Sequence, residues 1–523
     1  MFRKGVLTGR TPFYNTFNGD EMKIAFKENE FWWGGVIHDG RLMPIGKNDF
    51  YAVNLSKRTA GNQSVPFFLS TKGRYIYNNK PLSIIFENGT IITDEGVDII
   101  QSSGNTLSDA YREAMHTYFP FTGKVPETLF FSAPQYNTWA ELTYGQNQES
   151  VLAYAEAIIK NGYKPGVLMI DDTWQLDYGM WQFDTSRFPN PKIMVDELHE
   201  MGFRVMLWVV PYISPDSPAF RAAQNNKDRL LRDENNNPII IKWWNGYSAM
   251  IDMSKPDDIE WMRSELEGLK INYGIDGFKF DGANIEDFSD LPEEQIIKAS
   301  NGWHCFGGDN FAFHEVKDTW NCGGKPYIQR LRDKYHCWGA EGLADLIPDA
   351  LSLSLTGHPF ICPDMVGGGE WTCFLDGAVF DEELVVRFAQ CSALFPMIQF
   401  SVAPWRILSK KNREIVYNAQ KLHSDMGEEI ARIATESAKT GEPMMKSLDY
   451  SYPGNGYERI IDEFLLGDSI LVAPVLCKGE ESRKVVFPQG TWCDVQGNTI
   501  IGPTVREVVA DISCLPWYRK IDN

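Results

Sequence analysis

Residues 274–282 read Gly-Ile-Asp-Gly-Phe-Lys-Phe-Asp-Gly, which predicts a short buried strand that ends on a carboxylate. Because side chains alternate between the two faces of a strand, Lys279 and Asp281 share one face. Charged residues are rare inside a sheet unless they are paired or take part in chemistry. The ammonium group also favours the ionised form of the nearby carboxylate. The segment therefore fits a nucleophile of covalent catalysis, and it fits a structural Lys–Asp ion pair equally well.

The pattern of expected elements divides the chain into three parts. Residues 1–125 contain short β-rich runs broken by Gly, Asn and Asp, which predicts an N-terminal β-sandwich. Over residues 126–450, strand-like runs alternate with helical stretches, as is typical of a (β/α)8 TIM barrel. Residues 451–523 return to strands and predict a C-terminal β domain. The expected fold is therefore a multidomain α/β protein.

Composition argues against several classes of partner. The 523 residues carry a net charge of −20, whereas nucleic acid and anionic membranes attract basic patches. No apolar run approaches the length of a membrane span, and the N-terminus lacks the apolar core of a secretory signal. The 9 cysteines include no Cys-x-x-Cys pair, so we expect reduced thiols in a cytoplasmic protein. The 16 tryptophans suit either a large core or a carbohydrate site. Oligomeric state is not indicated.

Barrel enzymes carry their catalytic groups at the C-terminal ends of the strands. In this sequence the expected strand ends carry carboxylates, a lysine and tryptophans, namely Trp139, Asp171, Asp172, Trp174, Trp208, Lys279, Asp281 and Asp364. Such groups suit the binding of sugar hydroxyls and acid–base chemistry. No Gly-rich phosphate loop is present, and the 8 histidines are scattered, so we expect neither a metal ion nor another cofactor.

Five segments in the correct order resemble glycoside hydrolase family 31, a family of retaining α-glycosidases with a β-sandwich, a (β/α)8 barrel and C-terminal β domains. They are GVLMIDDTW at 166–174, the stretch 181–215, GFKFDG at 277–282, LSLTGHPFICPDMVGGGE at 353–370, and GDSILVAPV at 467–475 with VVFPQGTWCDV at 485–495. The third segment matches the Lys-x-Asp pattern of the nucleophile strand. The resemblance therefore implies that Asp281 is the nucleophile.

The position of the general acid is less directly marked. The family commonly carries it in a Trp-x-Gly-Asp motif, which this sequence lacks. Counting back from GLADLIPDALSLSLTGHPF places Asp333 at or within one residue of the acid position. Glu341 is the open alternative. Asp345 lies in a helical run, where we expect a surface or capping residue, so Asp333 is the favoured acid.

The resemblance also implies charged residues around the substrate. Asp171 and Asp172 should point in opposite directions, so one is expected to bind sugar hydroxyls while the other holds a neighbouring loop. Lys317 stands where the family normally carries an Arg, and a Lys cannot make the planar bidentate contact of an Arg. A surface lysine is the alternative for Lys317. Asp364 is expected to support the site by orienting Lys317 or another cation.

Four tryptophans have a structural and a functional interpretation. Trp208 either fills the barrel or forms the floor of the pocket, and Trp139 belongs either to the pocket wall or to the core. Trp243 and Trp244 are adjacent in a loop, where two such rings make a poor core element. One of them, assigned to Trp244, is expected to stack on the substrate.

The implied activity is that of a retaining, exo-acting α-glycosidase. Asp281 attacks the anomeric carbon, while Asp333 protonates the leaving oxygen and then activates water. The two carboxyl groups should lie about 5–5.5 Å apart. The pKa of Asp333 should be raised and that of Asp281 lowered, partly by Lys279.

The resemblance is closest to the α-galactosidase-like branch, so the expected substrate is an α-galactoside or a related glycoside. An α-glucosidase or α-xylosidase comes next, because many α-glucosidases keep the missing Trp-x-Gly-Asp motif. A sulfoquinovosidase comes third, because no Gln-Gln-Arg-Trp-like sulfonate-binding motif is present. A transglycosylase would look the same in sequence. A non-catalytic carbohydrate-binding relative is the alternative from a different class.

Overall fold

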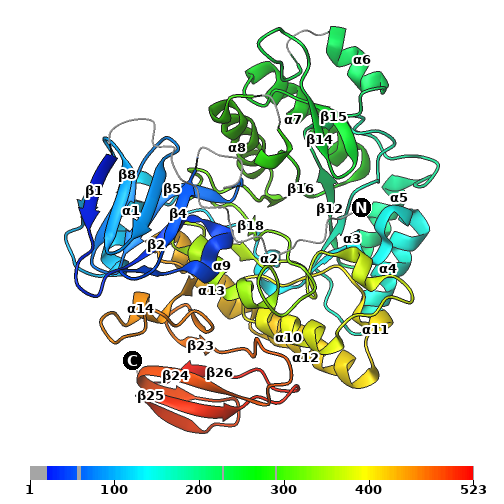
Figure 1. Cartoon of the computed structure of the whole chain (residues 1–523). Helices are drawn as coiled ribbons and strands as arrows, with labels where there is room; N and C mark the ends of the chain where they lie inside the picture. Colours follow the sequence, from blue (N-terminus) through cyan, green and yellow to red (C-terminus); the bar gives the residue numbers. More distant parts are fainter. Residues whose placement is uncertain (1–20, 56–60, 226–228, 289–290, 522–523) are drawn as a thin grey trace.

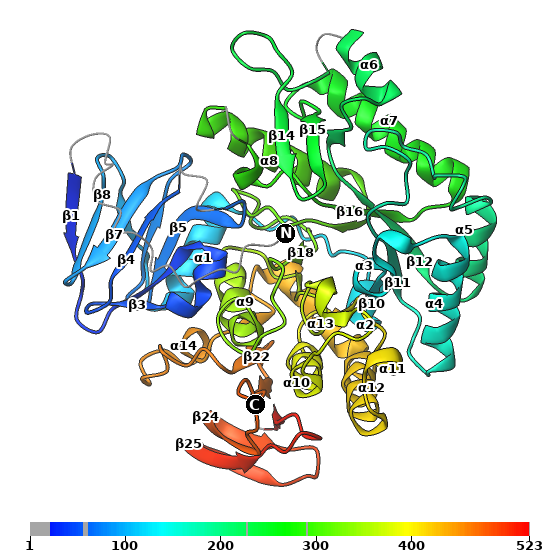
Figure 2. The same ribbon diagram turned by 45° about the vertical axis from the view of Figure 1, so that its right-hand side comes forward.

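The structure, a computed structural model, describes residues 21–521 apart from 56–60, 226–228 and 289–290. Figures 1 and 2 show three parts, with β-sheets at both ends of the sequence and a barrel with its helices between them. No described helix is both long enough and apolar enough to cross a membrane.

Two antiparallel sheets form the N-terminal part (Figure 1, blue). One has the strand order β1 (Glu21–Ala25), β8 (Thr90–Asp94), β7 (Ser83–Glu87) and β4 (Tyr51–Asn54). The other has the order β3 (Ile45–Gly46), β2 (Phe31–Val36), β5 (Ser64–Ser70), β6 (Arg74–Tyr77) and β9 (Ile99–Gln101). Phe86 of the first sheet meets Trp32 and Phe68 of the second, with ring centroids 6.2 and 5.5 Å apart. The two sheets therefore bury aromatic side chains against each other. Helix α1 (Leu107–Tyr118) follows them.

Eight short parallel strands form the barrel wall. They are β10 (Gln135–Asn137), β11 (Val167–Ile170), β12 (Arg204–Val209), β16 (Gly277–Phe280), β17 (Phe313–Glu315), β18 (Gln329–Arg330), β19 (Ile361–Cys362) and β20 (Gln399–Phe400). Six of them, β17-β16-β12-β11-β10-β20, share one sheet, and β18 pairs with β19. A parallel bridge between Val316 and Gln329 joins β17 to β18, and the Val366 N–H donates to the Gln399 carbonyl at 2.8 Å. The predicted TIM barrel and the C-terminal β domain are confirmed.

Helices connect the barrel strands or follow the last of them. They are α4 (Gln148–Lys160), α5 (Pro191–Glu200), α7 (Pro256–Tyr273), α8 (Glu293–Asn310), α9 (Leu346–Ser354), α10 (Glu382–Ser392) and α12 (Lys410–Asp425). The barrel departs from a regular (β/α)8 pattern after β17, because residues 316–328, all of them described, contain no helix. A second departure lies after β12, where the chain inserts the antiparallel strands β13 (Tyr212–Ile213), β14 (Ile240–Trp243) and β15 (Gly246–Met250) and helix α6 (Pro218–Asn225). This insertion brings the Trp243–Trp244 loop to the barrel.

Local sequence signals explain how the strand of residues 274–282 is placed. Helix α7 begins with Pro256 in its first turn and ends at Gly274, whose φ of 82° is left-handed and favours glycine. The chain then turns directly into β16. At Gly277 a Cβ would lie 1.8 Å from the Phe313 carbonyl oxygen, so β16 and β17 can approach this closely only with glycine. These two glycines fix where Lys279 and Asp281 stand.

The C-terminal sheet has the order β21 (Met445–Lys446), β22 (Phe464–Leu466), β23 (Ile470–Val472), β26 (Trp517–Lys520), β24 (Ser482–Cys493) and β25 (Thr499–Val509). Its first strand therefore begins a few residues before the predicted boundary at 451. Arg387 of α10 joins this sheet to the barrel, since its buried guanidinium donates to the carbonyls of Glu480 and Ala510 at 2.9 and 2.8 Å. These bonds connect α10 to the residues just before β24 and just after β25.

Candidate active site

Asp281 directly follows β16, and its side chain is buried at the C-terminal end of the barrel strands. Trp208 Nε1 donates to Asp281 Oδ2 at 3.0 Å, and the Gly282 N–H donates to Oδ1 at 2.9 Å. Lys317 Nζ lies 3.2 Å from Oδ1, and Lys279 Nζ lies 3.6 Å from Oδ2. Burial raises the pKa of this carboxyl group, but the ammonium groups of Lys317 and Lys279 overcome that effect and hold the pKa well below its ordinary value.

Lys279 links three neighbouring strands. Its Nζ lies 2.9 Å from Asp171 Oδ2, which also accepts a hydrogen bond from Asn137 Nδ2 at 2.8 Å. Burial lowers the pKa of Lys279, yet the carboxylates of Asp171 and Asp281 more than offset this and raise it above its ordinary value. Lys279 is therefore charged and fixes the end of β16 against β10 and β11.

Lys317 lies between the two carboxylates that the sequence singled out for catalysis. Its Nζ is 3.2 Å from Asp281 Oδ1 and 3.5 Å from Asp333 Oδ1. The Oδ1 atoms of Asp281 and Asp333 can be no farther apart than the sum of these two distances. This maximum separation is close to the lower limit of the roughly 6.5–9.5 Å found in inverting glycosidases. The spacing of a retaining pair, about 5–5.5 Å, fits within this bound. The Asp333 side chain is 57% exposed, so the site is open to solvent on that side.

Arg330 is the central cation on the Asp333 side, and the sequence analysis did not identify it. The residue is 1% exposed. Its guanidinium contacts Asp333 Oδ1 and Asp364 Oδ1, both at 2.6 Å, and Glu315 Oε1 at 3.1 Å. Asp364 thus orients Arg330, and its second oxygen accepts the Lys334 N–H at 2.6 Å. Burial raises the pKa of Asp364 to about 6 despite the opposing effect of Arg330.

The expected raised pKa of Asp333 is not found in this structure. Desolvation within the protein raises it, but Lys317 and Arg330 outweigh this effect and hold the pKa below its ordinary value. The physical reason is the direct contact with two cations, which the sequence did not reveal because Arg330 was overlooked. The ligand-free geometry therefore favours an ionised Asp333.

Asp172 holds a neighbouring loop. Tyr178 OH donates to Asp172 Oδ1 at 3.0 Å, and Asn245 Nδ2 donates to Oδ2. Asn245 lies between β14 and β15, and its Oδ1 accepts a hydrogen bond from Tyr144 OH at 2.9 Å. Burial and the adjoining Asp171 raise the pKa of Asp172 to about 7. Asp171 and Asp172 thus serve different groups, as their adjacency in sequence predicts.

Trp208, Trp243 and Trp244 form an aromatic cluster beside Asp281. Trp208 is buried and stacks on Trp243 with ring centroids 6.4 Å apart and an interplanar angle of 11°, so Trp208 both packs and donates to Asp281. Trp243 is buried, whereas Trp244 is 44% exposed and its ring centroid lies 6.4 Å from that of Trp208. Trp139 is partly exposed and its Nε1 donates to the Gly369 carbonyl at 3.2 Å. Of the adjacent pair, Trp244 is thus the ring open to a ligand.

The two alternatives for the general acid lie in a different hydrogen-bonded arrangement. The Glu341 N–H donates to Asp345 Oδ2 at 2.6 Å, and Asp345 also pairs with Arg41 at 3.3 Å. Asp345 is buried, so the expected surface position is wrong. It does occupy the expected capping position, the N-cap of α9, although its side chain makes no capping hydrogen bond there. Within the described chain, no ion pair joins Glu341 to Lys317 or Arg330.

Sequence reasoning missed three buried polar residues that complete this network, namely Asn137, Glu315 and Arg330. Each one ends a barrel strand, β10, β17 or β18. The rule that barrel enzymes carry functional groups at strand ends could therefore have found them, had these strands been recognised in the sequence. The strands are only two or three residues long, too short to show an alternating pattern.

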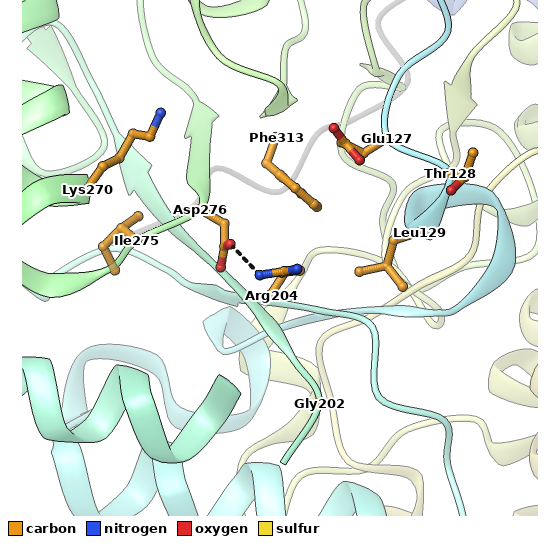
Figure 3. A pocket seen from close by; sticks show the side chains of 9 residues that line it. All are labelled: Glu127, Thr128, Leu129, Gly202, Arg204, Lys270, Ile275, Asp276 and Phe313. Carbon is orange, nitrogen blue, oxygen red and sulfur yellow. Dashed lines mark hydrogen bonds and ion pairs between the residues drawn. The ribbon is translucent and has the colours of Figure 1, made fainter. Parts of the chain in front are cut away.

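A cavity of 590 Å³ lies at the opposite end of the barrel, where strands begin (Figure 3). Arg204 opens β12 and pairs there with Asp276, which precedes β16, at 3.2 Å. Asp276 also contacts His199 Nε2 at 2.8 Å. In TIM barrels this end supports stability, while catalysis occurs at the other. Among the described residues, no group of three or more His, Cys, Asp or Glu side chains could hold a metal ion.

Comparison with known families identifies two domains of the chain. Residues 133–324 match the TIM-barrel domain of glycosyl hydrolases family 31, and residues 441–521 match the C-terminal domain of the same family. The barrel match includes Asp281 and Lys317.

Individual relatives extend the match along the chain. The chain is 32% identical to the mouse (Mus musculus) myogenesis-regulating glycosidase over 75% of its own length and 57% of that protein. It is 24% identical to alpha-glucosidase 2 of Bacillus thermoamyloliquefaciens over 92% of its length and 64% of that protein. The chain thus spans less than two thirds of these relatives.

A solved structure shows the same fold. The family 31 α-xylosidase from a soil metagenome, complexed with xylose, superposes with a TM-score of 0.79 at 20% identity, covering 96% of this chain and 79% of that one. The two domain matches, which together span half of the chain, show that it belongs to glycoside hydrolase family 31.

Proposed function

We propose that this protein is a retaining, exo-acting α-glycosidase that hydrolyses terminal α-linked sugars by double displacement. The observation that carries the proposal is the arrangement of Asp281, Lys317 and Asp333, in which one ammonium group contacts both carboxylates. A buried, ionised carboxylate close to a second carboxyl group suits a retaining mechanism, in which the first is the nucleophile and the second acts as acid and then as base. The intact arrangement favours an enzyme over a non-catalytic carbohydrate-binding relative.

In the first step Asp281 attacks the anomeric carbon, and Asp333 gives its proton to the leaving oxygen. Lys279 and Trp208 hold the Asp281 carboxylate, so little reorientation is needed at the moment of attack. Asp333 must take up a proton before this step, and its exposed side chain gives it access to water.

In the second step Asp333 acts as base on the attacking water. When Asp281 has become an ester, it no longer carries the negative charge that raises the pKa of Asp333. Lys317 and Arg330 then act on Asp333 alone and favour its ionised form. The contacts that oppose the acid role in the free protein thus support the base role in the glycosyl-enzyme.

For the sugar, we propose α-galactosides, on the resemblance of the DDTW strand end, the WWNG loop and the PDMVGGGE segment to the α-galactosidase-like branch. The α-glucosidase and the α-xylosidase among the relatives make α-glucosides and α-xylosides the second candidates. A sulfoquinovoside is the third. Asp171 or Asp172 is the candidate for the contact with the C4 hydroxyl, and hydrogen bonds from Asn137 and Tyr178 fix the positions of these two carboxylates.

Asp281→Asn should abolish turnover without unfolding the protein, because the amide is nearly isosteric but cannot form the ester. Asp196→Asn, an exposed change on α5, is the matched control and should keep full activity. Mass spectrometry after treatment with an activated fluoroglycoside should find the label on Asp281. A label on another carboxylate would refute the assignment.

Asp333→Ala should slow the hydrolysis of alkyl glycosides about 10²- to 10⁴-fold, and that of aryl glycosides with good leaving groups far less, because a good leaving group needs little protonation. Azide should restore turnover by occupying the vacated space. Glu341→Gln serves as the control. If Glu341→Gln shows this pattern and Asp333→Ala does not, the acid is Glu341.

Lys317→Met should move the pH profile of kcat/KM to higher pH. The ammonium group stabilises both ionised carboxylates, so its loss raises the pKa of Asp281, which must be ionised, and of Asp333, which must be protonated. The acidic and basic limbs should therefore both shift upward. Lys317→Arg keeps the charge and should keep the profile closer to that of the wild type. An unchanged profile in Lys317→Met would contradict this account.

Nitrophenyl α-galactoside should be cleaved with higher kcat/KM than nitrophenyl α-glucoside, with retention of configuration. The two sugars differ only at C4, and each mispaired buried polar group costs about 1–3 kcal/mol, which corresponds to roughly ten- to a hundredfold. Initial rates with both substrates and proton NMR of the first product measure the two points. A preference for the α-glucoside would reject the galactose assignment and leave the retaining mechanism intact.

A further inference from the structure

Two thiols lie in contact beside the segment that carries Lys317. Cys305 belongs to α8, and Cys322 belongs to the helix-free connection between β17 and β18. Their Sγ atoms are 3.2 Å apart, and each Sγ lies within hydrogen-bond distance of Asn301 Oδ1, at 3.3 Å for Cys305 and 2.9 Å for Cys322. A disulfide has an S–S distance of about 2.03–2.05 Å, so a shift of roughly 1 Å would join them.

The two thiols differ in a way that suits an attacking and a resolving cysteine. Cys305 is partly exposed, whereas Cys322 is buried. The hydrogen bond from Cys322 lowers the pKa of the Cys305 thiol, against the effect of burial, and Lys325 lowers it further. The same contact together with burial raises the pKa of Cys322. Oxidant-sensitive cysteines are typically accessible, of low pKa and next to a second cysteine.

We propose that Cys305 and Cys322 are a reversible redox site that forms a disulfide on exposure to hydrogen peroxide. The Cys305 thiolate attacks the peroxide, which breaks the O–O bond, gives a sulfenic acid and releases hydroxide. The Cys322 thiol then attacks the sulfenic sulfur, the S–S bond forms and water leaves. Two electrons pass from the two thiols to the peroxide, and a dithiol reductant reverses the change.

The disulfide would tie together two segments that hold the active site. On α8, Trp303 Nε1 donates to the Asp281 carbonyl at 2.9 Å, and the neighbouring His304 Nδ1 accepts the Lys317 N–H at 3.4 Å. Burial lowers the pKa of His304 to about 4, so its ring is neutral and can accept this bond. Cys322 lies five residues beyond Lys317 on the other segment. Pulling the two segments together therefore changes the position of Lys317 between the carboxylates, and this consequence rests on the proposed function.

The test uses the full chain, first reduced and then treated with hydrogen peroxide. The remaining thiols are alkylated, and the peptides are mapped by mass spectrometry. We expect a cross-linked peptide pair containing Cys305 and Cys322, two hydrogens lighter than the reduced pair and lost again with dithiothreitol. In Cys322→Ser, dimedone should instead trap a sulfenic acid on Cys305. Cys477→Ser, which removes an exposed cysteine elsewhere, is the matched control and should still form the cross-link.

Two readouts separate this proposal from the proposed function. Complete alkylation of both thiols after peroxide, or oxidation of Cys305 to the sulfinic acid without a cross-link, would overturn the redox site. For activity, kcat/KM of the cross-linked protein should fall at least twofold and recover on reduction, while Cys305→Ser should show no such change. Unchanged kcat/KM in fully cross-linked protein would overturn the link to Lys317. A reduced protein without activity on any glycoside would refute the proposed function, and the peptide map would still decide the redox site.

Discussion

The active site depends on the balance between buried carboxylates and the few cations that face them. An ion buried alone costs several kcal/mol, and removal of one partner from a buried pair typically costs about 3–5 kcal/mol. Burial acts on Asp281, Asp364 and Asp172 in the same direction, yet their pKa values differ. That of Asp281 is well below its ordinary value because two lysines face it, whereas that of Asp364 is about 6 with one arginine. Asp172 has only neutral donors and the neighbouring Asp171, and its pKa is about 7. Among these three carboxyl groups, the pKa is thus lower where more cations face the group.

The barrel makes this balance possible because the charged groups come from the ends of several strands. Lys279 and Asp281 come from β16, Asp171 follows β11, and Arg330 ends β18. Strands of two to six residues give each side chain a fixed direction and let groups far apart in sequence meet within hydrogen-bond distance. The close approach of β16 to β17 at Gly277 brings the segment that carries Lys317 up to Asp281. The backbone at Gly277 therefore affects the ion pair between Lys317 and Asp281.

The sequence was most informative where a strand was long or chemically unusual. The alternation in residues 274–282 correctly placed Lys279 beside Asp281, and the β/α alternation predicted the barrel. It was least informative in β17 and β18, which have three and two residues and are joined without a helix. No periodic pattern can mark such strands, so Glu315 and Arg330 were missed. The pKa of Asp333 was then mispredicted because it depends on Arg330, a partner that only the three-dimensional arrangement reveals.

The lysine at position 317 has a physical consequence that an arginine would not have in the same form. A planar guanidinium can bind a carboxylate in a bidentate manner, but in Arg330 each of the three nitrogens contacts a different carboxylate, those of Asp333, Asp364 and Glu315. An ammonium group is a compact charge, and Lys317 holds it 3.2 Å from Asp281 and 3.5 Å from Asp333. In the proposed cycle the negative charge leaves Asp281 when the ester forms, and it appears on Asp333 when the proton is donated. A cation placed between the two stabilises the charge in both states without moving, so the site needs little reorganisation as the reaction proceeds.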